Sequence, residues 1–257
     1  MFPGWGLRVV KFQRRVVSRG SRVLAILGSI VRTVEFDAVE LDVDRVTLSF
    51  SYPRKSDLSF LLEGDTVEAF IGGAPWFEGR ELELEDIGVS VYVKPSNTLS
   101  EGLRFRSIYE VLPKLVISLD LDMLRELALI TTRGGVEFIA LYMEGGSLLV
   151  LEGDRYKVTI PSLEALAAIH THPEGGCGLS EADVKSAAHA LADLALFEAV
   201  VTPSCAFYIA RIGFLDEPDF ELLLNNSGGM VNPVELATVK ARRMALGGVE
   251  NYITYLY

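Results

Sequence analysis

The stretch that most constrains the fold of this chain is 167–184, AAIHTHPEGGCGLSEADV, which is typical of a strand, a turn and a helix. An apolar run leads into His170-Thr171-His172, and the proline that follows cannot donate to a sheet, so we expect the strand to end there. Side chains of a strand alternate between its two faces, so the two histidines share a face. A glycine-rich turn follows, and Ser180 then begins a segment with helical apolar spacing.

The rest of the second half also alternates between helical and strand patterns, which predicts a mixed β-sheet flanked by helices in an α/β (α+β) domain. The expected helices cover 120–131, 181–196 and 232–246, and the expected strands cover 136–143, 148–151, 156–160, 164–172, 197–201, 206–211 and 220–224.

The first half is predicted to be richer in strands. A helix is expected over 21–34 with Ser21 as its N-cap, because its apolar residues recur at i, i+3, i+4 and i+7. Residues 7–17 fit a strand or a basic helix, and the strands expected beyond the helix cover 34–36, 41–43, 46–52, 66–71 and 87–93.

This pattern divides the chain into a smaller β-rich domain of unknown role, 1–115, and a second domain, 116–257. The first contains no histidine, no cysteine and no phosphate-binding glycine motif. It is therefore expected to recruit a protein partner, recognise a substrate or cover the second domain.

The charge and the cysteines exclude some classes of function. The net charge of −11 argues against broad nucleic-acid binding. Residues 1–34 nevertheless carry seven basic groups and no acidic one, and we interpret this basic arm as a face that docks on the acidic remainder of the protein, with a contact to a partner, RNA or a membrane as the alternative. No apolar run approaches the ~20 residues of a membrane span. Two cysteines give no disulfide framework, so reduced thiols and a cytoplasmic protein are expected.

His170, His172 and Asp183 are candidate ligands of one zinc ion per chain. Two imidazoles on one strand face and a carboxylate in the first turn of the next helix can supply three ligands, which leaves the fourth position open, as in catalytic zinc sites. Each feature alone has a simpler explanation, since His-x-His arises by chance and Ser180 with Asp183 also fits a helix capping box. Their conjunction within fourteen residues favours a metal site.

The sequence HTHPEGGCGLSEAD resembles the signature of the JAMM metalloproteases, also called MPN+, Mov34/PAD-1 or JAB-type domains. That signature is His-x-His-Pro, six residues and Ser-x-x-Asp, preceded by a distant glutamate. The resemblance covers about 118–215, suggests a prokaryotic or archaeal type of member and leaves the N-terminal extension unassigned. RadC-like proteins share the spacing. The matching residues are His170, His172, Pro173, Ser180 and Asp183.

The family glutamate lies on an early strand, and Glu137 in the strand expected at 136–143 fits it best. The alanine at position 140 stands where the family often has glycine, and the 33 residues from Glu137 to the first histidine form a shorter gap than expected. Glu144 and Glu152 are the alternatives, although both are expected in turns.

The resemblance implies a zinc-dependent isopeptidase or peptidase. Metal-activated water would hydrolyse an amide or isopeptide bond with Glu137 as general base, and Ser180 would donate a hydrogen bond to the oxyanion. The implied substrate is the C-terminal tail of a ubiquitin-like or sulfur-carrier protein. The alternatives are a RadC-like JAB-domain protein of uncertain chemistry and a non-catalytic MPN-type scaffold, which would lack ligands.

Three further residues invite a functional interpretation. Cys177 lies between the candidate ligands, where it would either pack in the loop or act as a fourth ligand. His189 follows Asp183 by six residues, which places it on another helix face and predicts a surface residue. Cys205 follows a Pro-Ser turn and has no partner in the motif.

Overall fold

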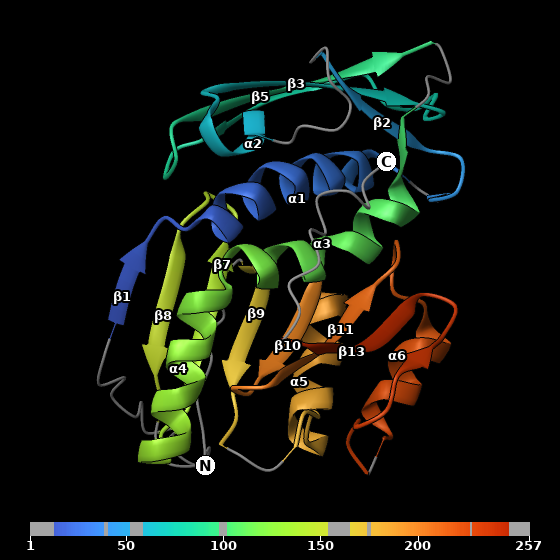
Figure 1. The fold of residues 1–257 in the computed structure, drawn as a ribbon. Helices are drawn as coiled ribbons and strands as arrows, with labels where there is room; N and C mark the ends of the chain where they lie inside the picture. Colours follow the sequence, from blue (N-terminus) through green and yellow to red (C-terminus); the bar gives the residue numbers. More distant parts are fainter. Residues whose placement is uncertain are drawn as a thin grey trace, which may run out of the picture.

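The computed structural model describes residues 13–38, 41–51, 59–97, 102–153, 165–173, 176–226 and 228–246. Within them the strands form two sheets, and the mixture of helices and sheets confirms the predicted fold class (Figure 1). The eight-stranded sheet has the order β1 (Gln13–Val16), β8 (Leu148–Glu152), β7 (Phe138–Met143), β9 (Ala165–Thr171), β10 (Phe197–Val201), β11 (Cys205–Arg211), β13 (Val239–Ala245) and β12 (Val234–Glu235). The five-stranded sheet has the order β4 (Arg80–Leu84), β5 (Val89–Ser96), β3 (Thr66–Gly72), β2 (Thr47–Phe50) and β6 (Leu103–Arg104).

Helices cover both faces of the eight-stranded sheet. One face packs against α1 (Arg19–Asp37), α3 (Phe105–Leu119) and α4 (Leu121–Gly134), and the other packs against α5 (Glu181–Ala192) and α6 (Glu217–Leu224). The short α2 (Ser59–Glu63) packs against α1. The side chains of β7 alternate accordingly, because Phe138, Ala140 and Tyr142 join the core of α1 and α3 while Ile139 and Leu141 face the opposite side.

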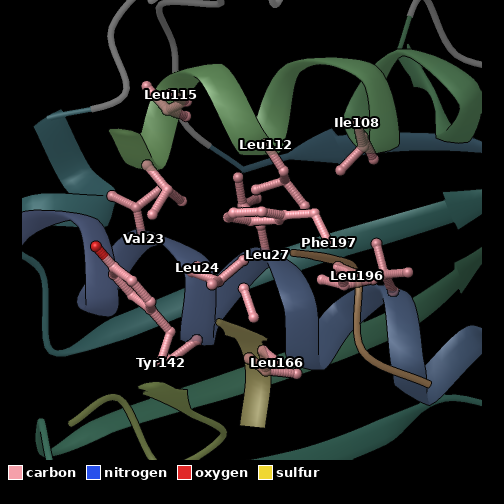
Figure 2. Packing of buried hydrophobic residues seen from close by; sticks show 14 of the residues in the cluster. Val23, Leu24, Leu27, Ile108, Leu112, Leu115, Tyr142, Leu166, Leu196 and Phe197 are labelled. Carbon is pink, nitrogen blue, oxygen red and sulfur yellow. The ribbon is translucent and has the colours of Figure 1, made fainter. Parts of the chain in front are cut away.

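Helix α1 lies between the two sheets (Figure 1). Apart from the exposed Phe36 near its C-terminal end, its apolar residues are buried all around the helix, as expected for a helix that contacts protein on most sides. Figure 2 shows Val23, Leu24 and Leu27 of α1 packed with the leucines and isoleucine of α3 and with Phe197 of β10. The two sheets therefore share one hydrophobic core.

Gly28 allows α1 to approach the eight-stranded sheet closely. A Cβ atom at this position would lie 2.9 Å from a methyl carbon of Leu166 and 3.1 Å from one of Leu196. Both leucines pack in the core shown in Figure 2. A larger residue here would push the helix away from β9, the strand that carries the candidate histidine ligands.

A buried ion pair joins α1 to β11. The guanidinium of Arg211 donates to both carboxylate oxygens of Glu35, at 2.8 Å for the Nη2–Oε2 contact, and to the carbonyls of Ala195 at 2.8 Å and Gly213 at 2.7 Å. The hydroxyl of Tyr109 on α3 also donates to Glu35. Burial raises the pKa of Tyr109, and Glu35 adds to that effect, so the phenol stays protonated.

The N-terminal helix and several strands agree with prediction, with shifted boundaries. The helix predicted over 21–34 is α1, but its N-cap is Ser18, and Ser21 is the third helical residue of a capping box. The strand expected at 34–36 is wrong because these residues extend α1, and of the strands expected over 41–52 only β2 forms. Strands β3 and β5 confirm predictions, whereas β4 was missed.

The second half contains the larger errors. Helix α3 was not predicted, and it contains a proline in its interior. The strand expected at 220–224 is instead part of α6, capped by Asp216. The helix expected over 232–246 is also wrong, because Val239 and Ala241 are buried as part of β13, which pairs with β11. The strand expected at 156–160 lies outside the described residues.

The predicted boundary between residues 115 and 116 falls inside α3. Strand β1 pairs with β8, and α1 packs on β7 and β9. Elements before residue 115 therefore contact elements after it directly. The division into two domains stays a prediction.

The basic arm contacts acidic groups and carbonyls of the same chain. Arg15 pairs with Asp86 at 2.5 Å, and Arg32 pairs with Glu144 at 3.2 Å. Arg22 donates to backbone carbonyls next to α2 and β5. No helix in the described part of the chain is long and apolar enough to cross a membrane.

Candidate metal centre

The candidate histidine ligands lie at the C-terminal end of β9. His170 is on the strand, and His172 follows it, with its backbone N–H donating 3.1 Å to the carbonyl of Val201 on the parallel neighbour β10. The Nε2 atoms of the two rings are 3.1 Å apart. Their side chains are 12% and 19% exposed, so both rings are accessible from one side.

Asp183 reaches the same place from α5. Ser180 is the N-cap of this helix, and its Oγ accepts from the Asp183 backbone N–H at 3.2 Å. The carboxylate of Asp183 accepts from the Ser180 N–H at 2.8 Å, which completes the capping box expected from the sequence. Because α5 connects the parallel strands β9 and β10, its N-terminus lies at the end of β9 where the histidines are.

The three side chains fit a metal ion. Oδ1 of Asp183 is 3.4 Å from Nε2 of His170, and Oδ2 is 3.3 Å from Nε2 of His172. Ligand atoms placed tetrahedrally at roughly 2.0–2.1 Å from zinc are about 3.3–3.4 Å apart. The two Nε2 atoms, 3.1 Å apart, are close to that spacing, and each oxygen of Asp183 lies at a similar distance from a different histidine. One ligand atom from each residue can be chosen so that all three lie within 4.8 Å of one another, which allows the three side chains to hold one cation, although other ions take the same ligand types.

The pKa of Asp183 indicates a ligand that stays ionised. Burial alone would raise this pKa, but hydrogen bonds from His170 and His172 outweigh burial and hold it well below its usual range. The side chain of Ser180 acts in the same direction. A carboxylate that remains charged across the physiological pH range is the form that binds a cation.

Glu137 lies beside these three groups. It precedes β7, which runs antiparallel to β9 with Ile139 opposite His170, so the start of β7 is next to the end of β9. Glu137 and Ile139 are two residues apart and share a face. Burial raises the pKa of Glu137, whereas His172 and His170 lower it and Asp183 raises it. These electrostatic interactions link Glu137 to all three candidate ligands.

The alternative glutamates lie elsewhere. Glu144 is in the turn at the opposite end of β7 and pairs with Arg32. Glu152 pairs across the sheet with Phe138, so its side chain belongs to the face opposite the histidines. Of the three glutamates weighed from the sequence, Glu137 is the one placed next to the ligands.

The loop between the ligands is anchored at two points. Cys177 forms a disulfide with Cys205 at the start of β11, with Cα atoms 5.9 Å apart. Leu179 and Met230 exchange two backbone hydrogen bonds, of 2.8 and 2.9 Å. Together these contacts hold the described part of the loop, and with it Ser180, against the sheet.

The disulfide corrects two predictions. The cysteines are not reduced, and Cys205 has a partner inside the motif. Cys177 packs in the loop as one interpretation expected, and as a disulfide it is not a metal ligand. No local pattern predicted this pairing, because a separation of 28 residues says nothing about proximity.

Two other residues complete the surroundings of the site. His189 is exposed on α5 and packs against the ring of Phe220 at 5.7 Å, so it is a surface residue, as predicted.

Glu198 on β10 was not predicted to have a role, although a charged residue inside an apolar strand is a visible signal. It is buried, its hydrogen bond from Ser186 is 3.4 Å long, and burial together with the charge of Asp183 raises its pKa to about 8.

Comparison with known proteins gives no assignment: no family model matches the chain, and no curated protein matches it.

Proposed function

We propose that this protein is a zinc-dependent peptidase or isopeptidase of the JAMM type. The observation that carries the proposal is the convergence of His170, His172 and Asp183 on one point, with Glu137 beside them at the start of a neighbouring strand. The resemblance of the motif to the JAMM signature supports the same class.

In this proposal His170, His172 and Asp183 hold one zinc ion. When bound, zinc would supply Lewis acidity, which makes a water molecule acidic enough to lose a proton near neutral pH. A carboxylate oxygen of Glu137 would accept the proton of the attacking water as the carbon–oxygen bond forms. Glu137 then passes the proton to the amide nitrogen as the carbon–nitrogen bond breaks, so that the base returns to its ionised form.

Ser180 has a hydroxyl that can serve the reaction as well as the helix. Its Oγ accepts the N–H of Asp183, and its hydroxyl also interacts with the Asp183 carboxylate, so in this proposal the hydroxyl turns from Asp183 to donate to the substrate. Ser180 is exposed at the helix N-terminus, where a developing oxyanion would also meet the positive end of the helix dipole. We assign it the role of oxyanion donor, a contribution that is typically worth about 3 kcal/mol.

The substrate class rests on the resemblance. We propose the C-terminal tail of a ubiquitin-like or sulfur-carrier protein, cleaved from a protein or peptide, and we keep a partner-binding role for residues 1–115 and a cytoplasmic location as predictions. Cytoplasmic disulfides are uncommon outside hyperthermophiles, so the pair Cys177–Cys205 makes the location a matter for direct measurement.

The test combines metal content with hydrolysis. The purified protein is expected to contain about one zinc per chain and to release the carboxyl-terminal partner from a ubiquitin-like fusion. Glu137→Gln should keep the metal and lose at least about a hundredfold in rate. Glu152→Gln is the matched control, because that carboxylate is nearby but on the other face of the sheet. Full activity of Glu137→Gln would reject the general base, and a wild-type protein without metal would reject the proposed class.

A further inference from the structure

Thr171 lies between the two histidines but faces the other side of the sheet. Its side chain belongs to the face covered by α4, where it is 1% exposed. The hydroxyl of Thr131 on α4, which is fully buried, lies 2.6 Å from the Thr171 hydroxyl. Thr171 therefore has no direct access to the point where the histidines converge.

The Thr171 hydroxyl contacts the backbone of β7 next to the proposed base. The N–H of Phe138 donates to Oγ1 of Thr171 at 2.9 Å. The regular pairing of β7 with β9 begins one residue later, at Ile139 and His170. A side-chain oxygen thus continues the hydrogen bonding of the two strands beyond the point where their backbone pairing stops.

The hydrogen bond acts on a single peptide group. The peptide that joins Glu137 to Phe138 has its N–H bonded to Thr171 and its C=O bonded to the N–H of Gly153 at 2.8 Å. Both polar atoms of this peptide are held, one by β9 and the other by the end of β8. Because the peptide plane is rigid, fixing it fixes the position of the Glu137 Cα atom, from which the side chain leaves the backbone.

We propose that Thr171 is a positioning residue, which through the 137–138 peptide aims the carboxylate of Glu137 at the ligands that flank Thr171 in sequence. The inference rests on the proposed function, since it assigns Glu137 the role of general base. One residue thereby couples the strand that carries the ligands to the strand that carries the base. A displacement of about 1 Å in a reacting group can lower a rate by as much as a hundredfold.

Three variants separate positioning from packing. Thr171→Val keeps the shape and removes the hydroxyl, whereas Thr171→Ser keeps the hydroxyl and removes a methyl group. Thr33→Val is the matched control, because Thr33 is a buried threonine on α1, near Glu144 at the far end of β7. The readouts are zinc per chain, kcat and KM on a ubiquitin-like fusion, and hydrogen exchange of the Phe138 amide.

The Thr171→Val variant is expected to bind zinc at the wild-type ratio, to lose about tenfold to a hundredfold in kcat with KM within about twofold, and to exchange the Phe138 amide faster. Thr171→Ser should restore kcat to within about threefold, and Thr33→Val should leave all readouts unchanged. A Thr171→Val variant with wild-type kcat, or a Thr171→Ser variant as slow as Thr171→Val, would overturn the positioning role. A zinc-loaded wild-type protein without hydrolytic activity would overturn the proposed function instead, while the exchange data would still report on the hydrogen bond.

Discussion

A cluster in the core and a cluster at the end of β9 each join a carboxylate to nitrogen-bearing side chains, and they differ in their access to solvent. In the core, Arg211 and Glu35 have side chains that are at most 1% exposed, and the guanidinium is bonded to the carboxylate and to backbone carbonyls. At the end of β9, His170, His172 and Asp183 are 12% to 22% exposed. The core cluster is complete without a further ion, whereas the three side chains at the sheet end could hold one between them. The comparison distinguishes a buried ion pair that joins α1 to β11 from a solvent-accessible cluster that could bind a cation.

The largest effect is expected from the solvent-accessible cluster of His170, His172 and Asp183 at the end of β9. His172→Ala should lower zinc from about one per chain to near zero and reduce hydrolysis by at least about a thousandfold, because two ligands cannot hold a catalytic zinc. Metal analysis and initial rates measure both. His189→Ala is the control, since that histidine is exposed and packs on Phe220. A His172→Ala protein that retains its zinc would show that the ligand set is misassigned.

The buried cluster of Arg211 and Glu35 is expected to affect stability rather than catalysis. Arg211→Met leaves Glu35 buried without its cation and should lower the free energy of unfolding by about 3–5 kcal/mol. The double variant Arg211→Met with Glu35→Leu should recover much of that loss, because it removes both charges. Denaturant unfolding measures each. If the single variant is as stable as the wild type, the ion pair does not stabilise the fold.

The disulfide near the candidate metal ligands is expected to have an intermediate effect on stability. Replacing Cys177 and Cys205 by alanine should lower the free energy of unfolding by about 3 kcal/mol, because the link closes a loop of 28 residues in the unfolded chain. Zinc binding should persist, since Leu179 still pairs with Met230. Unfolding of the wild type with and without a reductant provides the comparison. An unchanged midpoint on reduction would argue against the bond.

The smallest effect concerns Glu198. Like Glu35 it is buried, but its hydrogen-bond partner among the described residues is the neutral side chain of Ser186. In the metal-free protein its pKa is raised from 4.5 to about 8, so the folded protein keeps a proton that the unfolded chain loses. The free energy of unfolding should therefore fall as the pH rises from about 5 to 8. Glu198→Gln should flatten that slope in unfolding curves recorded across the pH range. A slope identical to that of the wild type would contradict the raised pKa.

The sequence was most informative where the determinants are local. The elements that carry His170, His172 and Asp183 follow one another within fourteen residues, so periodicity, a proline and an N-cap were enough to predict their arrangement. Glu137 was predicted through the family resemblance, and its place beside the ligands follows from the antiparallel pairing of β7 with β9. Its catalytic role stays a prediction.

Features that depend on distant contacts were predicted poorly. The Asn-Pro pair at 232–233 is a good local signal for a helix, but pairing with β11 draws the following residues into β13. The pairing of Cys177 with Cys205 depends on how β10 turns back into β11, which no local pattern encodes. The role of Thr171 was equally hidden, because its partners Thr131 and Phe138 are 40 and 33 residues away.

The position of α1 bears on which fragments of this chain could fold without the rest. A helix whose apolar side chains meet protein on most sides cannot remain in water if one sheet is deleted. A fragment beginning at residue 116 would lack α1, β1 and most of α3, and would leave part of one face of the eight-stranded sheet uncovered and one edge unpaired. In the described part of the chain, residues of the N-terminal half thus belong to the same hydrophobic core as the eight-stranded sheet. Any protein that uses the same sheet without this helix has to cover that face with something else.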